Sequence, residues 1–417
     1  MREMKDSGIE WIGAIPTTWH TQKMKYISNF IQNKYSSDYG LLPYIGLENI
    51  ASWSGSFIST NSQYDREQSL ICEPEDILFG KLRPYLAKVY MNDRLCCCSN
   101  EFAVIRVNGQ NKRYMWYQLL SHGFIFEIDR STYGTKMPRA NAEFIRNVFV
   151  ALPSEIEQQK IANYLDKMCA EIDAVLEKTC ASIEEYKKLK QAIITQAVTK
   201  GIRGDRPMKD SGIEWIGDIP AEWGVVPHKR IMHKVKEICE QYNGEDIISL
   251  TVNGVVKRDL TAGGKMPTSF DGYQYVEPND LLLCLFDIDV TPRCVGVVRD
   301  YGVTSPAYSR FVMHDGYYNA YYDYLLRMID DNKVFVHLSK NLRSSLTESD
   351  FGAIKTCAPP LAEQKCIAAF LDVRCDEIDA LIAKKQQYLT EIENYKKSLI
   401  YEYVTGKKEV KTSVLAD

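Results

Sequence analysis

The residues best suited to chemistry in this sequence are basic and aromatic side chains beside turns, and no catalytic motif accompanies them. The sequence has no Asn-Pro-Pro-aromatic or Asp-Pro-Pro-aromatic tetrapeptide, no GxxxxGK[ST] phosphate loop and no HExxH zinc motif. Its six histidines show no catalytic spacing. We therefore expect a binding protein that is not an enzyme and needs no cofactor.

The segment FGKLRPYL holds the first group of candidate binding residues, Lys81, Arg83 and Tyr85. Gly80 and Pro84 predict a bent, exposed segment. Such a segment presents long hydrogen-bond donors to DNA phosphates or to guanine edges. A solvated loop at the edge of a domain explains the same residues equally well.

Two further basic segments occupy matching places in the two halves of the chain, 207 residues apart. The first, STYGTKMPRAN, contributes Tyr133, Lys136 and Arg139. The second, HLSKNLRSSL, contributes Lys340, Asn341 and Arg343. The matched position favours DNA contact over a structural loop, and weaker candidates of the same kind are Lys257, Arg258 and Arg293.

The overall charge argues against strong binding of phosphates by this chain alone. The formal net charge is -4. Residues 20–150 hold 15 Lys and Arg against 12 Asp and Glu, and residues 225–355 hold 15 against 17. Because affinity for DNA that does not depend on sequence comes mainly from basic side chains, we expect partner proteins to supply much of the positive surface.

The cysteines and acidic clusters do not indicate a metal site. The twelve cysteines include the consecutive Cys96, Cys97 and Cys98, and no CxxC pair recurs at a zinc-site distance. We interpret them as reduced residues, and the acidic clusters at 73–76 and 287–289 as solvated turns. Without a signal sequence or a long apolar run, the chain is expected to be cytoplasmic and not membrane-bound.

The chain is one unit of about 206 residues written twice. MKDSGIEWIGAIPTTW at residue 4 and MKDSGIEWIGDIPAEW at residue 208 are identical at 13 of 16 positions. EQQKIANYLDKMCAEIDAVL at 157 and EQKCIAAFLDVRCDEIDALI at 363 form a second repeated pair. The stretches between these motifs differ and alternate between strand and helix patterns. We expect two mixed α/β (α+β) domains of different specificity, with the tryptophan motif packed against the domain that follows it.

Each repeat ends in a long helix with heptad spacing. The predicted apolar seam of the first helix comprises Ile161, Leu165, Met168, Ile172, Val175, Thr179, Ser182, Tyr186, Leu189 and Ile193, and that of the second comprises the residues 206 positions later. If a pseudo-two-fold axis relates the repeats, the two helices pair as an antiparallel coiled coil. The alternative is two independent amphipathic helices, each lying on its own domain.

With these residues established, the chain resembles the specificity subunits of type I restriction-modification systems over nearly its full length. The resemblance rests on the repeated KDSGIEWIGxIPxxW opening, on FGKLRPYL, on Pro153 and Pro360 before the EQ pairs, and on AVTKG and YVTGK at the helix ends. The second insert lacks FGKLRPYL and is similar to a different class of recognition domain.

The resemblance implies a target-recognition domain in each insert, each reading one half of an asymmetric bipartite site in double-stranded DNA, with the long helices as spacer. It implies binding to two modification subunits, which methylate adenine N6, and to restriction subunits, while the chain itself is non-catalytic. The expected parts are a motif and recognition domain (1–153), a spacer helix (154–204), the second motif and domain (205–359), the second helix (360–407) and a tail (408–417). The competing hypothesis is a coiled-coil adaptor that binds only proteins.

Overall fold

The computed structural model describes residues 2–60, 66, 68–134, 136–252, 254–260, 267, 269–291, 293–339 and 345–410. The chain divides into two compact units. The first unit comprises Met1–Cys180 and Gln386–Asp417, and the second comprises Ala181–Lys385. Each unit therefore combines one globular domain with a portion of both long helices.

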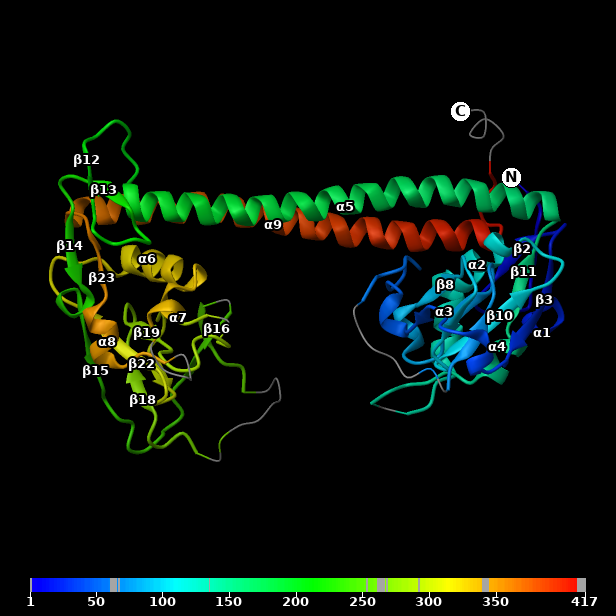
Figure 1. Ribbon diagram of the computed structural model, residues 1–417, viewed down its shortest axis with the longest axis horizontal. Helices are drawn as coiled ribbons and strands as arrows, with labels where there is room; N and C mark the ends of the chain where they lie inside the picture. The colour runs from blue at the N-terminus through cyan, green and yellow to red at the C-terminus, as the bar shows by residue number, and fades with distance from the viewer. Residues whose placement is uncertain are drawn as a thin grey trace. The chain divides into compact units, whose positions relative to one another are not determined.

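The two long helices are α5 (Glu155–Lys200) and α9 (Leu361–Val404). In the first unit, Asp173 of α5 forms an ion pair with Lys396 of α9, and the Tyr164 ring packs against that of Tyr403. The residue number on one helix rises as that on the other falls, so the two segments are antiparallel (Figure 1). This confirms the predicted antiparallel pairing.

In the second unit the same two helices pair through equivalent residues. Lys190 of α5 contacts Asp379 of α9, with 2.6 Å between Nζ and Oδ2. Both residues lie 206 positions from their counterparts in the Asp173–Lys396 pair. The internal repeat of the sequence is thus also a repeat of helix contacts.

The heptad spacing of the seam was predicted correctly, but alternate positions were wrong by one residue. Val175 and Leu189 are 40% and 48% exposed. The helix instead turns Cys169 and Ile183 inward. On α9 the corresponding exposed residues are Arg374, Leu381, Tyr388 and Tyr395, and the more buried ones are Cys375, Ile382, Leu389 and Lys396. The seam therefore includes a buried lysine, which pairs with Asp173.

The domain of the first unit is built on small antiparallel sheets. Its four-stranded sheet has the order β4 (Ser28–Ile31), β10 (Phe102–Val107), β7 (Ile77–Gly80) and β8 (Val89–Met91). Its three-stranded sheet has the order β5 (Tyr44–Ile45), β9 (Cys96–Cys98) and β6 (Leu70–Cys72). Two-stranded pairs join β1 (Met4–Asp6) to β2 (Ala14–Pro16) and β3 (His20–Lys23) to β11 (Phe149–Leu152).

The helices of this domain are α1 (Met24–Ile27), α2 (Lys112–Leu120), α3 (His122–Arg130) and α4 (Ala142–Asn147), with short 3-10 turns η1 (Ser37–Tyr39), η2 (Leu47–Asn49) and η3 (Pro84–Leu86). The side chains of Asn111 and Ser121 accept hydrogen bonds from the first turns of α2 and α3. Such caps satisfy backbone donors that a helix start leaves free. They explain why two helices follow each other directly here.

The domain of the second unit has the same strand order despite its different sequence. Its four-stranded sheet has the order β15 (Met232–Val235), β22 (Ser309–Met313), β19 (Leu281–Leu283) and β20 (Val295–Val297). The second sheet contains β16 (Ile247–Thr251), β21 (Gly302–Thr304) and β18 (Gln274–Val276) and adds β17 (Gly254–Lys257) at its edge. The two inserts are therefore variants of one topology, distinguished by the β16–β17 hairpin.

The remaining elements of the second unit also have counterparts in the first. The pairs are β12 (Met208–Asp210) with β13 (Asp218–Pro220) and β14 (Gly224–Pro227) with β23 (Lys355–Ala358). The helical elements are η4 (His228–Arg230), α6 (Asn319–Asp331), α7 (Val334–Leu338) and α8 (Glu348–Ala353). No helix in the described parts of the chain has the length and apolar character needed to cross a membrane.

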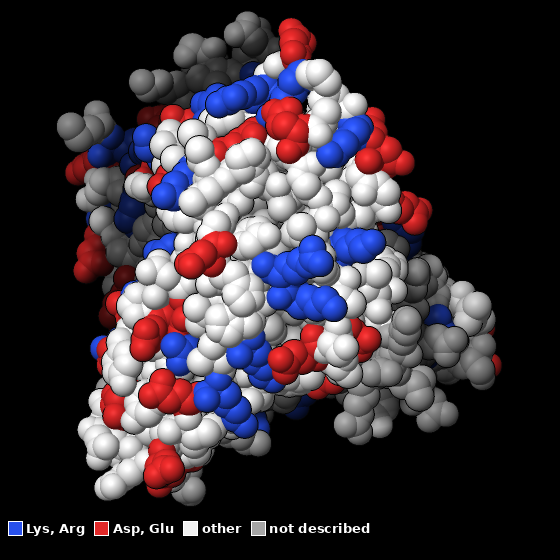
Figure 2. Space-filling model, turned by 90° about the vertical axis from the view of Figure 1, so that its left-hand side faces the viewer, with Lys and Arg blue, Asp and Glu red and all other residues white. Residues whose placement is uncertain are grey.

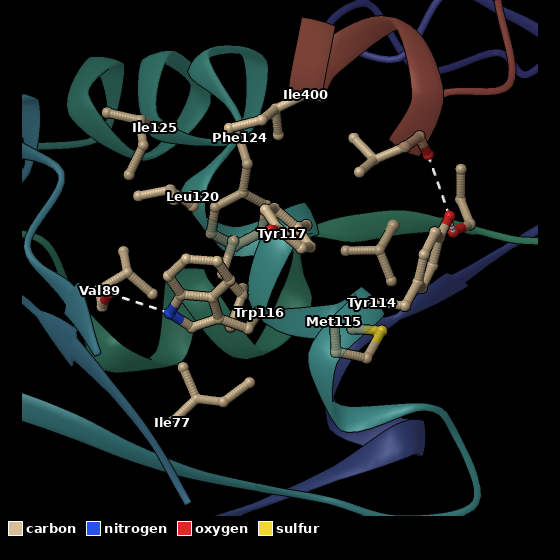
Figure 3. Packing of buried hydrophobic residues seen from close by; sticks show 14 of the residues in the cluster. Ile77, Val89, Tyr114, Met115, Trp116, Tyr117, Leu120, Phe124, Ile125 and Ile400 are labelled. Atoms are coloured by element: carbon tan, nitrogen blue, oxygen red, sulfur yellow. Dashed lines mark hydrogen bonds between the residues drawn. The ribbon is translucent and has the colours of Figure 1, made fainter. Parts of the chain in front are cut away.

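In each unit a tyrosine of the domain binds the end of a long helix. The Tyr114 hydroxyl on α2 lies 3.0 Å from the carbonyl oxygen of Val404, and the Trp116 indole on the same helix donates to Val89 O on β8 (Figure 3). In the second unit, the Tyr321 hydroxyl donates to the carbonyl oxygen of Val198. The last carbonyls of a helix have no partner within the helix, so these bonds satisfy groups that burial would otherwise leave unpaired.

The repeated tryptophan motif is buried scaffolding, as predicted. Trp19 is 1% exposed, and its Nε1 donates to Glu157 in the first turn of α5 at 3.0 Å. The equivalent bond joins Trp223 to Glu363 at the start of α9 at 2.8 Å. Carboxylates are favourable at helix N-termini, and here they also hold the motif in place. The repeated EQ pair therefore has a structural role that sequence reasoning did not assign.

Candidate nucleic-acid interface

The loop that follows β7 presents the first candidate residues outward. Arg83 takes a left-handed backbone conformation (φ 50°), and Pro84 begins the short turn η3. The backbone N–H of Lys81 donates to Glu101 O, and that of Arg83 donates to Pro138 O at 2.7 Å. The backbone of the loop is thus fixed, while the Arg83 and Tyr85 side chains are exposed.

The structure brings the second candidate segment directly beside this loop. Tyr133 and Arg139 face each other across a tight bend, with backbone hydrogen bonds in both directions. The Ala140 N–H then donates to Lys81 O at 2.9 Å, and Leu82 pairs with Arg139. Two segments about 50 residues apart in the sequence therefore form one continuous surface.

The basic residues of this surface differ in burial and in whether they already form an ion pair. Arg139 forms a bidentate ion pair with Glu101, with 3.0 Å between Nε and Oε2. Lys81 is half-buried, and its pKa is lowered by burial and by the nearby Arg139 cation. Arg83 and Lys136 form no ion pair with any residue that the structure describes. These two are the cations best placed to bind an external acceptor.

Large apolar side chains lie among these cations. Tyr85 is 45% exposed, Tyr133 63% and Met137 62%. Guanidinium and ammonium groups bind phosphates and guanine edges, and exposed aromatic or thioether groups contact bases or enter between base steps. We refer to Lys81, Arg83, Tyr85, Tyr133, Lys136, Met137 and Arg139 as the first-domain surface.

In the second unit the three predicted basic residues that the structure describes lie at the two ends of the β16–β17 hairpin. Lys257 forms an ion pair with Asp246, with 2.6 Å between Nζ and Oδ1, and Arg258 follows it at the open end of the β16–β17 hairpin. Arg293 donates to Val252 O at the turn of that hairpin, and burial lowers its pKa. Lys340, Asn341 and Arg343 lie outside the described residues.

Sequence reasoning missed the loop of the second unit that corresponds to the FGKLRPYL segment. The Leu346 N–H donates to Leu285 O at 2.8 Å, as Ala140 does to Lys81. Asp287 has φ 47°, close to the value at Arg83. Aligning EDILFG at 75 with NDLLLC at 279 would have revealed the match.

One acidic cluster has a structural role that corrects its interpretation as a solvated turn. Asp76 is 1% exposed and binds Arg106 in two hydrogen bonds, of which the shorter is 2.8 Å. Asp280 and Arg310 repeat this pair in the second unit at 2.6 Å. Within the described residues, no group of three His, Cys, Asp or Glu side chains is arranged to hold a metal ion.

Charged side chains of both signs share the face shown in Figure 2, where one small group of Lys and Arg lies near the centre. Acidic side chains lie below this group and to its left, and others are scattered over the rest of the face. The face therefore has no broad basic area, in keeping with the net charge of -4.

Known proteins share both this sequence pattern and this fold. A family model described as "Type I restriction modification DNA specificity domain" matches residues 16–185. The putative type I restriction enzyme MjaX specificity subunit of Methanocaldococcus jannaschii is 24% identical over 96% of each chain. The MjaVIII specificity subunit of the same organism is 25% identical over 74% of each chain.

Solved structures agree in fold. One described as "Structural basis underlying complex assembly and conformational transition of the type I R-M system" matches with TM-score 0.75 and 16% identity, covering 94% of this chain and 99% of that one. The HsdS subunit from Thermoanaerobacter tengcongensis matches with TM-score 0.51 and 16% identity over 94% and 98%. Residues 16–185 are the part of the chain that matches the type I restriction-modification DNA specificity domain in sequence. Over most of its length the chain is thus similar in sequence to specificity subunits of type I restriction-modification systems, and it shares the fold of solved structures from such systems.

Proposed function

We propose that this chain reads an asymmetric, bipartite site in double-stranded DNA, with one domain for each half. The observation that carries the proposal is that two domains that are variants of one topology expose different side chains at the same place. Arg83 is exposed in the first domain and Asp287 in the second. Different donors and acceptors recognise different base edges, so the two half-sites differ.

The chain is non-catalytic in this proposal, and its partners supply the chemistry. Two modification subunits methylate adenine N6, and restriction subunits cut the DNA. The methylated base would leave the stack and enter a pocket of the modification subunit. The full sequence lacks methyltransferase motifs, so in this proposal methylation requires the assembled complex. The complex acts on chromosomal DNA and therefore in the cytoplasm.

Exposed apolar residues on the helices support two docking places for modification subunits. In the first unit, Val175 and Tyr395 are 40% and 52% exposed, within one turn of the Asp173–Lys396 pair. In the second unit, Leu381 and Leu189 occupy the equivalent positions. Two equivalent apolar patches in one chain favour a complex of one specificity subunit with two modification subunits.

The first prediction tests the first-domain surface in the assembled complex. Replacing Arg83 or Lys136 by alanine should weaken binding by about 1–3 kcal/mol and relax one position of one half-site if the side chain reads a base. A phosphate contact would instead weaken all sequences alike and lower the salt dependence by about one counterion. Gel shifts against singly substituted sites at several salt concentrations distinguish these roles.

Arg94→Ala is the matched control for this experiment. Arg94 lies in the same domain, is exposed, and pairs only with its neighbour Asp93 among the residues described. Its loss removes the same charge without touching the first-domain surface. Equal effects of Arg94→Ala and Arg83→Ala would reduce the role of Arg83 to general electrostatics. Binding without any sequence preference would favour the protein-binding adaptor.

A further inference from the structure

The second domain has a loop with a fixed backbone at the place where the first domain carries Arg83. It follows β19 and runs from Leu285 to Thr291. The Asp287 carbonyl accepts hydrogen bonds from the N–H and hydroxyl groups of Thr291, at 2.9 and 2.8 Å. Leu285 and Ile288 are 8% and 1% exposed, so they anchor the loop in the core. The backbone is thereby held in one shape.

The side chains that this loop exposes are apolar or acidic. Phe286 is 40% exposed and Val290 is 73% exposed. The Asp287 carboxylate is exposed and has no ion pair or hydrogen bond with the part of the chain that the structure describes. The first-domain surface has the reverse character, with free cations beside tyrosines.

An exposed carboxylate at this place is compatible with base contacts and incompatible with phosphate contacts. Phosphates repel Asp287, whereas a carboxylate accepts a hydrogen bond from the N4 amino group of cytosine in the major groove. Apolar side chains such as Phe286 and Val290 contact the methyl group of thymine. Residues 225–355 also hold more acidic than basic residues, as expected of a domain that depends less on phosphates.

We propose that Phe286, Asp287 and Val290 form the base-reading loop of the second domain, with Asp287 selecting cytosine and the two apolar side chains selecting an adjacent thymine. The proposal rests on the proposed function and assigns a different recognition chemistry to each half-site. In one half-site Arg83 donates hydrogen bonds to a base edge. In the other half-site Asp287 accepts a hydrogen bond from a base edge. The same position of the fold thus carries a hydrogen-bond donor in the first domain and an acceptor in the second.

The experiment compares Asp287→Asn with the parent chain, each assembled with its modification subunits. Methylated adenines are mapped on genomic DNA, and affinity is measured on duplexes that carry each base at each position. Asp287→Asn is expected to lose about 5- to 150-fold of its preference at one cytosine of one half-site, the range for one good base contact. Phe286→Ala and Val290→Ser are expected to relax a thymine in the same half-site.

Two controls make the outcome decisive. Asp300→Asn removes the same charge from an exposed position of the same domain and should leave both half-sites unchanged. Thermal unfolding reports whether each variant is folded. Folded Asp287→Asn and Phe286→Ala with unchanged half-sites would overturn the loop assignment. If Arg83→Ala also changed neither half-site and no sequence preference existed, the proposed function itself would fail.

Discussion

Replacing Val175 and Tyr395 together by glutamate is expected to reduce the assembled complex from two modification subunits to one. Val175 and Tyr395 are 40% and 52% exposed, and they lie within one turn of the Asp173–Lys396 ion pair, so we expect the free chain to stay folded. In the complex, two apolar side chains that would each contribute about 1.5–3 kcal/mol on burial become carboxylates that cannot be buried unpaired. The loss exceeds a hundredfold in affinity for that place.

The equivalent pair in the second unit provides the matched experiment. Leu189→Glu with Leu381→Glu should remove the other modification subunit, and the quadruple variant should remain alone. Lys178→Glu changes an exposed, polar position of α5 and should keep both partners. Light scattering of the purified complexes measures the stoichiometry. Two modification subunits on the Val175–Tyr395 variant would show that this patch is not a docking place.

Lengthening both long helices is expected to lengthen the nonspecific spacer of the DNA site. The design inserts four residues after Cys180 in α5 and four after Lys385 in α9, where the two units meet in the sequence. Each insertion adds about 6 Å of helix and advances it by about 40° beyond a full turn. DNA rises about 3.4 Å per base pair, so the spacer should grow by one or two base pairs.

The control inserts four residues into α5 alone. A single insertion lengthens α5 between Asp173 and Lys190 but leaves the distance between Asp379 and Lys396 on α9 unchanged. The antiparallel helices then cannot form both the Lys190–Asp379 and the Asp173–Lys396 ion pairs in register. An insertion of four residues in a heptad pattern, called a stutter, locally unwinds a coiled coil. The two helices can stay paired when both carry the insertion. We expect the single insertion to lower stability and the double insertion to keep it. An unchanged spacer in an active double variant would show that the helices do not set the distance.

The repeat, the two domains and the antiparallel helices were predictable because they leave a strong sequence signal. At one of the shifted positions of the seam, hydropathy favours Leu189 over Lys190, although Leu189 is the more exposed of the two. Lys190 is drawn inward by Asp379, and Lys396 by Asp173. Such ion pairs join residues about 190 to 220 positions apart, which periodicity cannot detect.

For the first-domain surface, the two basic segments could be predicted from the sequence, but their contact could not. Matching positions in the two repeats identified both basic segments, but their contact depends on the backbone bond between Ala140 and Lys81. The same geometry commits Arg139 to Glu101, which no local pattern indicates. In the second domain the corresponding loop could not be predicted from residue type, because a loop that binds DNA is expected to be basic and Asp287 is acidic.

The central claim is that each domain reads its own half of an asymmetric site, and exchange of the second insert tests it most directly. Residues 225–355 are replaced by the corresponding insert of another specificity subunit, and methylated adenines are mapped across the genome of cells that carry the complex. The account predicts that one half-site changes completely while the other half and the spacer length stay the same. A change in both half-sites, or in neither, would contradict it.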